Sequence, residues 1–263
     1  DKLYCARKDS PLVVGKASHG SFIASDIPAI LEYSRDVFLL DNMEVAVLTK
    51  DDIKIYNELG QEVKKDVLHV DWDVKTAQKG GFKHYMMKEM HEEPIALKDT
   101  LSPGIIEENG FMRLRDDQMP LESDYIKNIK RIFFVACGTA YHCGLVGKNI
   151  IEKQLRIPVI ADIASEFRYR DPIIGPEDLV IVISQSGETA DTIPAMKLAQ
   201  SRGAKVLAIC NVVGSTIARE ADFVCYTWAG PEISVCSTKA YVSQLMMTYI
   251  LILDIARKRG IFD

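Results

Sequence analysis

The sequence has few of the features that direct a protein to nucleic acid or to a membrane. Its 263 residues include 32 lysines and arginines and 37 aspartates and glutamates, which gives a net charge of −5. This balance provides no attraction to the phosphates of nucleic acid or of an anionic bilayer. The apolar stretch at residues 245–253 is ended by Asp254 at roughly half the ~20 residues that a membrane-spanning helix needs. We therefore expect neither nucleic acid nor a membrane as a partner, and a buried helix at this stretch.

The cysteines and histidines show neither a disulfide framework nor the spacing of a metal site. No two cysteines form a Cys-x-x-Cys pair, and the histidines are scattered. Several cysteines lie in or next to apolar runs, where a free thiol behaves as a small hydrophobic group. The sequence also does not open with a basic–apolar–small leader. We therefore expect a reduced, cytoplasmic setting, no secretion signal and no metal ion. The cysteines are Cys5, Cys137, Cys143, Cys210, Cys225 and Cys236.

Residues 1–78 show the short alternating or β-branched runs that are typical of antiparallel hairpins. Turn signals such as Asp41-Asn42 separate the runs, and one helical segment is predicted near residues 28–33. Four strands and one helix make a poor closed core, so we expect residues 1–78 to be part of a larger β-rich domain. The predicted strands are residues 12–15, 37–40, 45–48 and 53–56.

Residues 79–120 have the composition of a connector. Gly80-Gly81 precede a charged helical stretch at residues 84–98, which Pro94 is expected to kink. Residues 99–120 are mixed in character and contain several prolines and glycines, which predicts a loop.

Residues 121–263 change to the pattern of an α/β domain. Short, near-continuous apolar runs alternate with helical stretches of fitting length. Strands that are apolar at successive positions are buried on both faces, so the pattern predicts a parallel five-stranded sheet between helices, a three-layer αβα fold. The predicted strands are residues 133–136, 158–161, 179–183, 206–210 and 223–226.

The third of these strands is followed by Ser184-Gln185-Ser186-Gly187-Glu188-Thr189. Open α/β sheets bind ligands at the carboxyl ends of their strands, and the N-terminus of a following helix favours anions. The hydroxyls and the carboxamide add neutral donors, which suits a phosphate ester held without lysine or arginine. Serine-rich turns are common, so a capped loop is the alternative interpretation.

Two further segments place polar groups where they can meet this turn. Cys137-Gly138-Thr139 follows the first strand, and Val235-Cys236-Ser237-Thr238-Lys239 opens the last helix. Because parallel strands bring such loops to one edge of the sheet, we expect a single pocket. Each segment also has a local explanation: Thr139 and Ser237 could simply cap the helices that follow them.

Several ordered motifs together resemble the glutamine–fructose-6-phosphate aminotransferase (isomerising) family, also called glucosamine-6-phosphate synthases. Residues 137–139, 164–170, 184–192, 208–212 and 237–240 resemble the first sugar isomerase (SIS) domain of that family. Residues 3–26 are similar to the distal part of its glutaminase domain, and residues 84–98 to its interdomain helix. The resemblance implies a division into residues 1–78 from the glutaminase, residues 79–120 as the linker, and residues 121–263 as the first SIS domain.

In that family, a glutaminase with an N-terminal nucleophile releases ammonia, which paired SIS domains use to convert fructose 6-phosphate to glucosamine 6-phosphate in amino-sugar biosynthesis. The resemblance implies that Asp26 holds the α-amino group of glutamine; by position, Asp26 also fits a helix cap. It further implies a homodimer and no cofactor. The residues implied for the phosphate are Ser184, Gln185, Ser186 and Thr189, and those for the sugar are Thr139, Val235 through its backbone, and Ser237.

The sequence also departs from the family pattern. It begins at Asp1 without the family's nucleophilic cysteine, and it lacks the second SIS domain with its Schiff-base lysine, glutamate base and ring-opening histidine. Ala140 stands where the family often has a serine near the phosphate, and residues 17, 19 and 20 also differ. We therefore expect a fragment without catalytic residues of its own, which binds a hexose phosphate but does not turn it over.

Two other functions stay open from the residues. A free-standing SIS regulator would need a DNA-binding domain in the first part of the chain, where no basic recognition helix is predicted. A ketose–aldose isomerase that acts alone would need an acid/base pair near the serine turn, and Glu188 and Glu166 are available for it.

Overall fold

The computed structural model describes residues 1–8, 11–25, 27, 29–31, 33–70, 79–108, 111–115 and 120–261. The chain forms two compact units, Asp1–Gly80 and Gly81–Asp263. None of the helices within these described residues is long and apolar enough to cross a bilayer.

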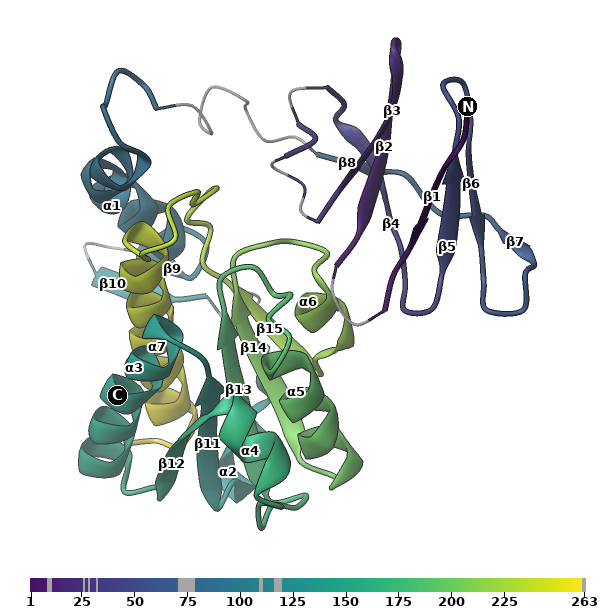
Figure 1. Cartoon of the computed structure of the whole chain (residues 1–263). Coiled ribbons are helices and arrows are strands. Elements are labelled where there is room, and N and C mark those ends of the chain that lie inside the picture. The colour runs from purple at the N-terminus through teal and green to yellow at the C-terminus, as the bar shows by residue number, and fades with distance from the viewer. Residues whose placement is uncertain are drawn as a thin grey trace. The chain divides into compact units, whose positions relative to one another are not determined.

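The first unit consists of two antiparallel four-stranded sheets (Figure 1). The four predicted strands are confirmed, but the predicted number was too low, because short or exposed strands give little sequence signal. The described residues near position 30 form turns, where a helix was predicted, and Asp26 lies outside the described residues. One sheet contains β1 (Leu3–Ala6), β5 (Val45–Leu48), β6 (Ile53–Tyr56) and β7 (Glu62–Val63); the other contains β3 (Gly20–Ala24), β2 (Val13–Ala17), β4 (Asp36–Leu39) and β8 (Leu68–His69).

Two small cores hold this unit together. Val14 packs with Ala46 and Ile55 between the two sheets. Its neighbour Val13 points to the opposite face of the same sheet, as strand alternation requires, and packs there with Ile30. Both residues are buried, so β2 is a central strand with apolar contacts on both faces.

The second unit contains the predicted parallel five-stranded sheet with helices on both faces, which confirms the three-layer αβα fold (Figure 1). The order β12-β11-β13-β14-β15 places β13 in the middle, and all seven residues of β13 are buried. The strands are β11 (Arg131–Ala136), β12 (Val159–Ile163), β13 (Asp178–Ser184), β14 (Lys205–Cys210) and β15 (Phe223–Tyr226).

Alternate residues of the strands pack into two different layers. Phe134 contacts the layer of α3 (Thr139–Ile150) and α7 (Lys239–Lys258), and a π-helical turn at Ile151–Leu155 extends α3. Phe133 contacts the other layer, where its ring lies edge-on to Phe167, with 6.1 Å between the ring centroids. That layer consists of α4 (Ala164–Tyr169), α5 (Thr192–Ser201) and α6 (Thr216–Glu220).

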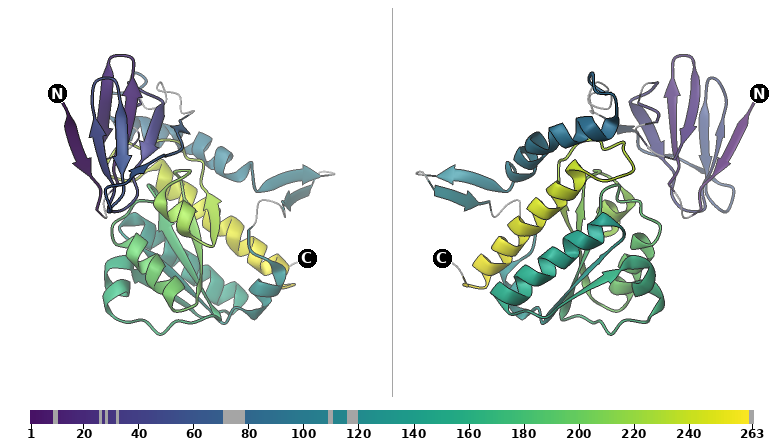
Figure 2. Two further views of the ribbon diagram at one scale, coloured as in Figure 1. Left: turned by 90° about the vertical axis from the view of Figure 1, so that its right-hand side faces the viewer. Right: turned by 60° about the vertical axis from the view of Figure 1, so that its left-hand side comes forward.

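The predicted helix of the connector is α1 (Tyr85–Leu101), which runs through Pro94 and packs along α7 (Figure 2). The expectation of a loop at residues 99–120 was wrong in part. Strands β9 (Ile105–Glu108) and β10 (Phe111–Leu114) form an antiparallel hairpin there. A short helix, α2 (Ser123–Asn128), then leads into β11. Residues 109–110 and 116–119 lie outside the described residues.

Candidate functional site

A cavity of about 250 Å³ lies at the carboxyl ends of β11 and β13. All seven residues that the sequence suggested for the sugar and the phosphate line it, so the three polar segments meet at one edge of the sheet. They are Ser184, Gln185, Ser186 and Thr189 from the turn after β13, Thr139 from the first turn of α3, and Val235 and Ser237 from the loop before α7.

The turn after β13 is held by hydrogen bonds among its own residues. The Oγ of Ser184 accepts a bond from the backbone N–H of Gly187 at 3.0 Å and lies 2.8 Å from the Oγ1 of Thr189. The Oγ of Ser186 accepts a bond from the N–H of Glu188 at 3.1 Å. Helix α5 begins only at Thr192, and Pro194 lies in its first turn. Residues 185–191 therefore form a separate loop between β13 and α5, and the last of them, Asp191, is the N-cap of α5. We call residues 184–189 the serine turn.

Gly187 is required in this turn by both its conformation and its surroundings. Its φ is +65°, a region that L side chains rarely adopt. A Cβ atom at this position would lie 2.0 Å from the Oγ of Ser215, which is buried at the start of α6. The backbone carbonyl of Gly187 also accepts a hydrogen bond from Ile217, so the serine turn packs directly on α6.

The other wall of the cavity is the loop between β15 and α7. Glu232 in this loop accepts hydrogen bonds at its Oε1 from the N–H groups of Thr238 and Ala240, at 2.8 and 3.0 Å, and at its Oε2 from the hydroxyl of Ser237 at 3.1 Å. A carboxylate at this place also interacts favourably with the positive end of the α7 dipole. Glu232 therefore caps α7, and Ser237, which was a candidate for that cap, donates to Glu232 instead.

Thr139 is the first residue of α3, whose N-cap is Gly138. Gly138, and not Thr139, is therefore the cap of α3. Thr139 lines the cavity together with Ala140. The side chain of Val235 is fully exposed. Val235 is nevertheless among the residues that line the cavity.

Gln244, one turn into α7, is a lining residue that the sequence analysis missed. Its side chain is buried, yet its Oε1 has no hydrogen-bond partner among the described residues. A buried acceptor without a partner is unfavourable unless a ligand or water satisfies it. The sequence could have indicated this residue, because Gln244 is a polar side chain on the buried face of a predicted helix.

The described lining residues carry no lysine, arginine or histidine, and Glu232 is their one ionisable carboxylate. Neither carboxylate suggested for an isomerase that acts alone lines the cavity. Glu166 is exposed on α4. The Oε1 of Glu188 accepts a bond from the N–H of Thr216 at 2.7 Å, so it caps α6. The described part of the chain also holds no cluster of three metal-ligating side chains.

Two further residues of the sequence motifs, Asn211 and Lys239, lie behind the residues that line the cavity and support them. Asn211, directly after β14, donates its backbone N–H to the carbonyl of Gln185, and its side chain bonds to the loop after β15. Lys239, which the sequence analysis did not assign to catalysis, is buried and pairs with Glu92 at 2.7 Å.

Comparison with known proteins places this architecture in a family. The SIS domain family matches residues 125–254. Glutamine–fructose-6-phosphate aminotransferases (isomerizing) from Caldanaerobacter subterraneus subsp. tengcongensis and Clostridium tetani are each 52% identical over 260 residues, which is 99% of this chain and 42% of theirs. The chain thus spans less than half the length of these curated relatives.

Among solved structures, the C-terminal domain of glucosamine-fructose-6-phosphate aminotransferase from Francisella tularensis superposes with a TM-score of 0.65 and 38% identity. The match covers 71% of this chain and 51% of that domain. The described residues of the first unit form strands and no helix. The matches show that the chain carries a SIS domain and belongs to the family of the glutamine–fructose-6-phosphate aminotransferases.

Proposed function

We propose that the cavity binds fructose 6-phosphate or glucosamine 6-phosphate, and that the chain is part of an enzyme that makes glucosamine 6-phosphate from fructose 6-phosphate and glutamine. The observation that carries the proposal is the serine turn, which presents several hydroxyls to one cavity without any cation. Family membership supplies the substrate class, and the geometry supports a neutral phosphate site.

An accounting of hydroxyl hydrogens supports the phosphate end of the site. Ser184, Ser186 and Thr189 have three hydroxyl hydrogens, and one of them is used in the bond between Ser184 and Thr189. The Oγ of Ser186 only accepts in the protein's own described bonds. Two hydrogens therefore remain for a phosphate, whose oxygens are strong acceptors. These neutral donors can hold the anionic phosphate by hydrogen bonds alone, without a lysine or arginine.

The sugar end is formed by Thr139, Ser237, the backbone of Val235 and the carboxamide of Gln244. These groups can donate to and accept from hydroxyls of a sugar, whereas the carboxylate of Glu232 repels a phosphate. The phosphate is thus expected at the serine turn and the sugar toward the loop before α7.

The cavity binds but does not contain the groups for the chemistry. Amination of a ketose needs an amine for the imine and a general base for the proton. The described lining residues have no amine, and their one carboxylate is occupied by the start of α7. We expect the reactive groups to come from elsewhere in the enzyme, and this chain to bind the sugar phosphate without turnover.

The family also supports proposals for the rest of the chain. We assign residues 1–78 to the glutaminase, with Asp26 as its contact to the glutamine amino group, residues 79–120 to the linker, and residues 121–263 to the first SIS domain. A cytoplasmic homodimer belongs to the same proposal.

Calorimetric titration with fructose 6-phosphate and glucosamine 6-phosphate tests the function. We expect saturable binding by the wild-type chain, none with fructose, and a loss of affinity of about tenfold in Ser186→Ala, which removes one hydroxyl donor to a charged group. The matched control is Ser201→Ala, a serine at the end of α5 away from the cavity. Equal affinity in Ser186→Ala, or no binding by folded protein, would contradict the proposal.

A further inference from the structure

The loop that carries Val235 and Ser237 has no regular secondary structure. We call residues 231–238 the site loop; it joins the region after β15 to α7. Glu232 and Ser234 in the same loop also line the cavity. An irregular segment that forms a wall of a binding site must be ordered by contacts from other elements, because each of its residues otherwise keeps its conformational freedom.

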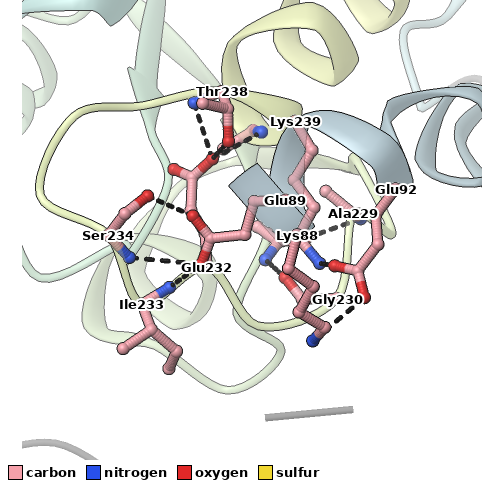
Figure 3. Close-up of polar contacts among 12 residues, drawn as sticks. Lys88, Glu89, Glu92, Ala229, Gly230, Glu232, Ile233, Ser234, Thr238 and Lys239 are labelled. Carbon is pink, nitrogen blue, oxygen red and sulfur yellow. Dashed lines mark hydrogen bonds and ion pairs between the residues drawn. The ribbon is translucent and has the colours of Figure 1, made fainter. Parts of the chain in front are cut away.

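Glu89 on α1 supplies such contacts. Its side chain is almost completely buried, with 1% exposure. Its Oε1 accepts bonds from the backbone N–H groups of Ile233 and Ser234, at 2.7 and 3.2 Å, and its Oε2 accepts from the hydroxyl of Ser234 (Figure 3). The three described donors to this carboxylate all belong to the site loop, 144 and 145 residues further along the chain.

A buried carboxylate is unfavourable unless donors satisfy it, and bonds to a charged acceptor are stronger than neutral ones. The loop amides in turn have no sheet or helix partners. The Glu89 carboxylate and the loop amides therefore satisfy each other's hydrogen-bonding needs. These bonds fix the position of Ile233 and Ser234 relative to α1.

The next turn of the same helix holds the end of the loop. Glu92, three residues after Glu89, receives the Nζ of Lys239 at 2.7 Å and the Nζ of Lys88 at 2.9 Å. Lys239 is the first residue of α7, directly after the site loop, and both lysines are buried. Figure 3 shows Glu92 and Lys88 of α1 and Lys239 of α7 directed toward one another. Helix α1 thus holds the loop at its middle and at its end.

We propose that Glu89 is a positioning residue of the sugar-phosphate site: it holds the site loop where Val235 and Ser237 reach the ligand. Glu89 is absent from the residues that line the cavity, so it acts through Ser234 and its neighbours rather than by touching the sugar. This inference rests on the proposed function, since it assigns a ligand-binding consequence to a contact outside the cavity.

Hydrogen exchange and calorimetry of the whole chain test the proposal together. In Glu89→Ala we expect the amides of Ile233 and Ser234 to exchange about tenfold faster or more, and the affinity for fructose 6-phosphate to fall on the order of tenfold. Glu89→Gln keeps an acceptor for both amides and is expected to restore most of the affinity. Glu93→Ala, on the same helix and without a described bond to the loop, is the matched control and should bind like wild type.

Several results would overturn the proposal. These are unchanged loop exchange in Glu89→Ala, unchanged affinity in it, or an equal loss in Glu93→Ala. If Glu89→Ala does not fold, Glu89→Asp carries the test, because it keeps the charge but draws the carboxylate back by one methylene. Failure of the wild-type chain to bind would contradict the proposed function instead. The exchange comparison then still decides whether Glu89 orders the loop.

Discussion

The two walls of the cavity achieve their shapes in different ways. The serine turn has bonds among its own residues, such as Ser184 to Thr189, and its other described bonds reach Asn211, Thr216 and Ile217, which follow it in the same domain. The site loop depends on Glu89, which lies more than a hundred positions earlier in the chain. A locally held wall keeps its geometry as long as its strand is in place, whereas a remotely held wall responds to changes in another helix. The phosphate end is therefore expected to be rigid and the sugar end to be adjustable.

The largest effect is predicted for a substitution of Gly187, whose backbone conformation shapes the serine turn. Gly187→Ala combines a positive φ with a clash against Ser215, and we expect a loss of about 4 kcal/mol in the free energy of unfolding. Gly214→Ala is the control, because its φ is +76° but a Cβ atom would meet nothing within 4 Å; a loss of about 1 to 2 kcal/mol is expected there. Urea unfolding measures both. Equal losses would show that the contact with Ser215 is unimportant.

The next largest effect weakens the remotely held wall. Glu92→Gln removes the carboxylate that pairs with the buried ammonium groups of Lys88 and Lys239, and we expect a loss of about 3 kcal/mol in the free energy of unfolding at pH 7. Thermal unfolding of the variant beside wild type measures it. Gln substitution at the exposed Glu177 is a suitable control, since its partner Lys130 is also exposed.

The same pair predicts a pH dependence. Burial raises the pKa of Glu92, but the bonds and charges of Lys239 and Lys88 outweigh burial and leave the pKa below its ordinary value of 4.5. A carboxyl with a lowered pKa stabilises the fold above the unfolded value, and this stabilisation is lost as the pH falls through the folded value. The stability gap between wild type and Glu92→Gln should therefore stay constant down to about pH 4.5 and shrink below it. A gap at pH 3 that is as large as the gap at pH 7 would contradict the assignment.

A smaller change should strengthen binding of the phosphate from the first turn of α3. Ala140 lines the cavity beside Thr139, and Ala140→Ser adds a hydroxyl donor there. We expect fructose 6-phosphate to bind more tightly by about 1 kcal/mol, or roughly fivefold. Ala140→Val, which adds volume without a donor, should weaken binding in the same calorimetric experiment. A serine variant no tighter than wild type would show that the phosphate lies elsewhere.

The smallest perturbation is chemical labelling of a cysteine in the site loop. Burial raises the pKa of Cys143 to about 11 and those of Cys210 and Cys225 to about 12, so these thiols stay protonated at pH 8. Cys236 is exposed in the site loop. Mass spectrometry should find iodoacetamide on Cys236 long before the three buried thiols. Comparable labelling of Cys210 in folded protein would contradict its burial at the end of β14.

The two walls also differ in how far the sequence could predict them. The serine turn follows an apolar strand directly, so its composition and its place at the sheet edge could both be inferred locally. The seven suggested residues accordingly line one cavity. Glu89 appears in the sequence as an ordinary charge on a helix, and its partners are backbone amides, which carry no residue signal. Gln244 likewise acquires meaning only when α7 packs beside the cavity. Contacts between residues so far apart in the sequence form only when the helices and the sheet have packed together.

The hairpin of β9 and β10 illustrates the same limit in the fold. Its strands are four residues each and lie among prolines and glycines, so local propensity favoured a loop. The five parallel strands were predictable because burial on both faces makes nearly every position apolar.

A crystal structure of the chain grown with fructose 6-phosphate tests the central claim most directly. We predict the phosphate between Ser184, Ser186 and Thr189, with no lysine or arginine in contact with it, and the sugar directed toward Ser237 and Gln244. A phosphate held by basic side chains elsewhere, with the serine turn free of ligand, would contradict this account.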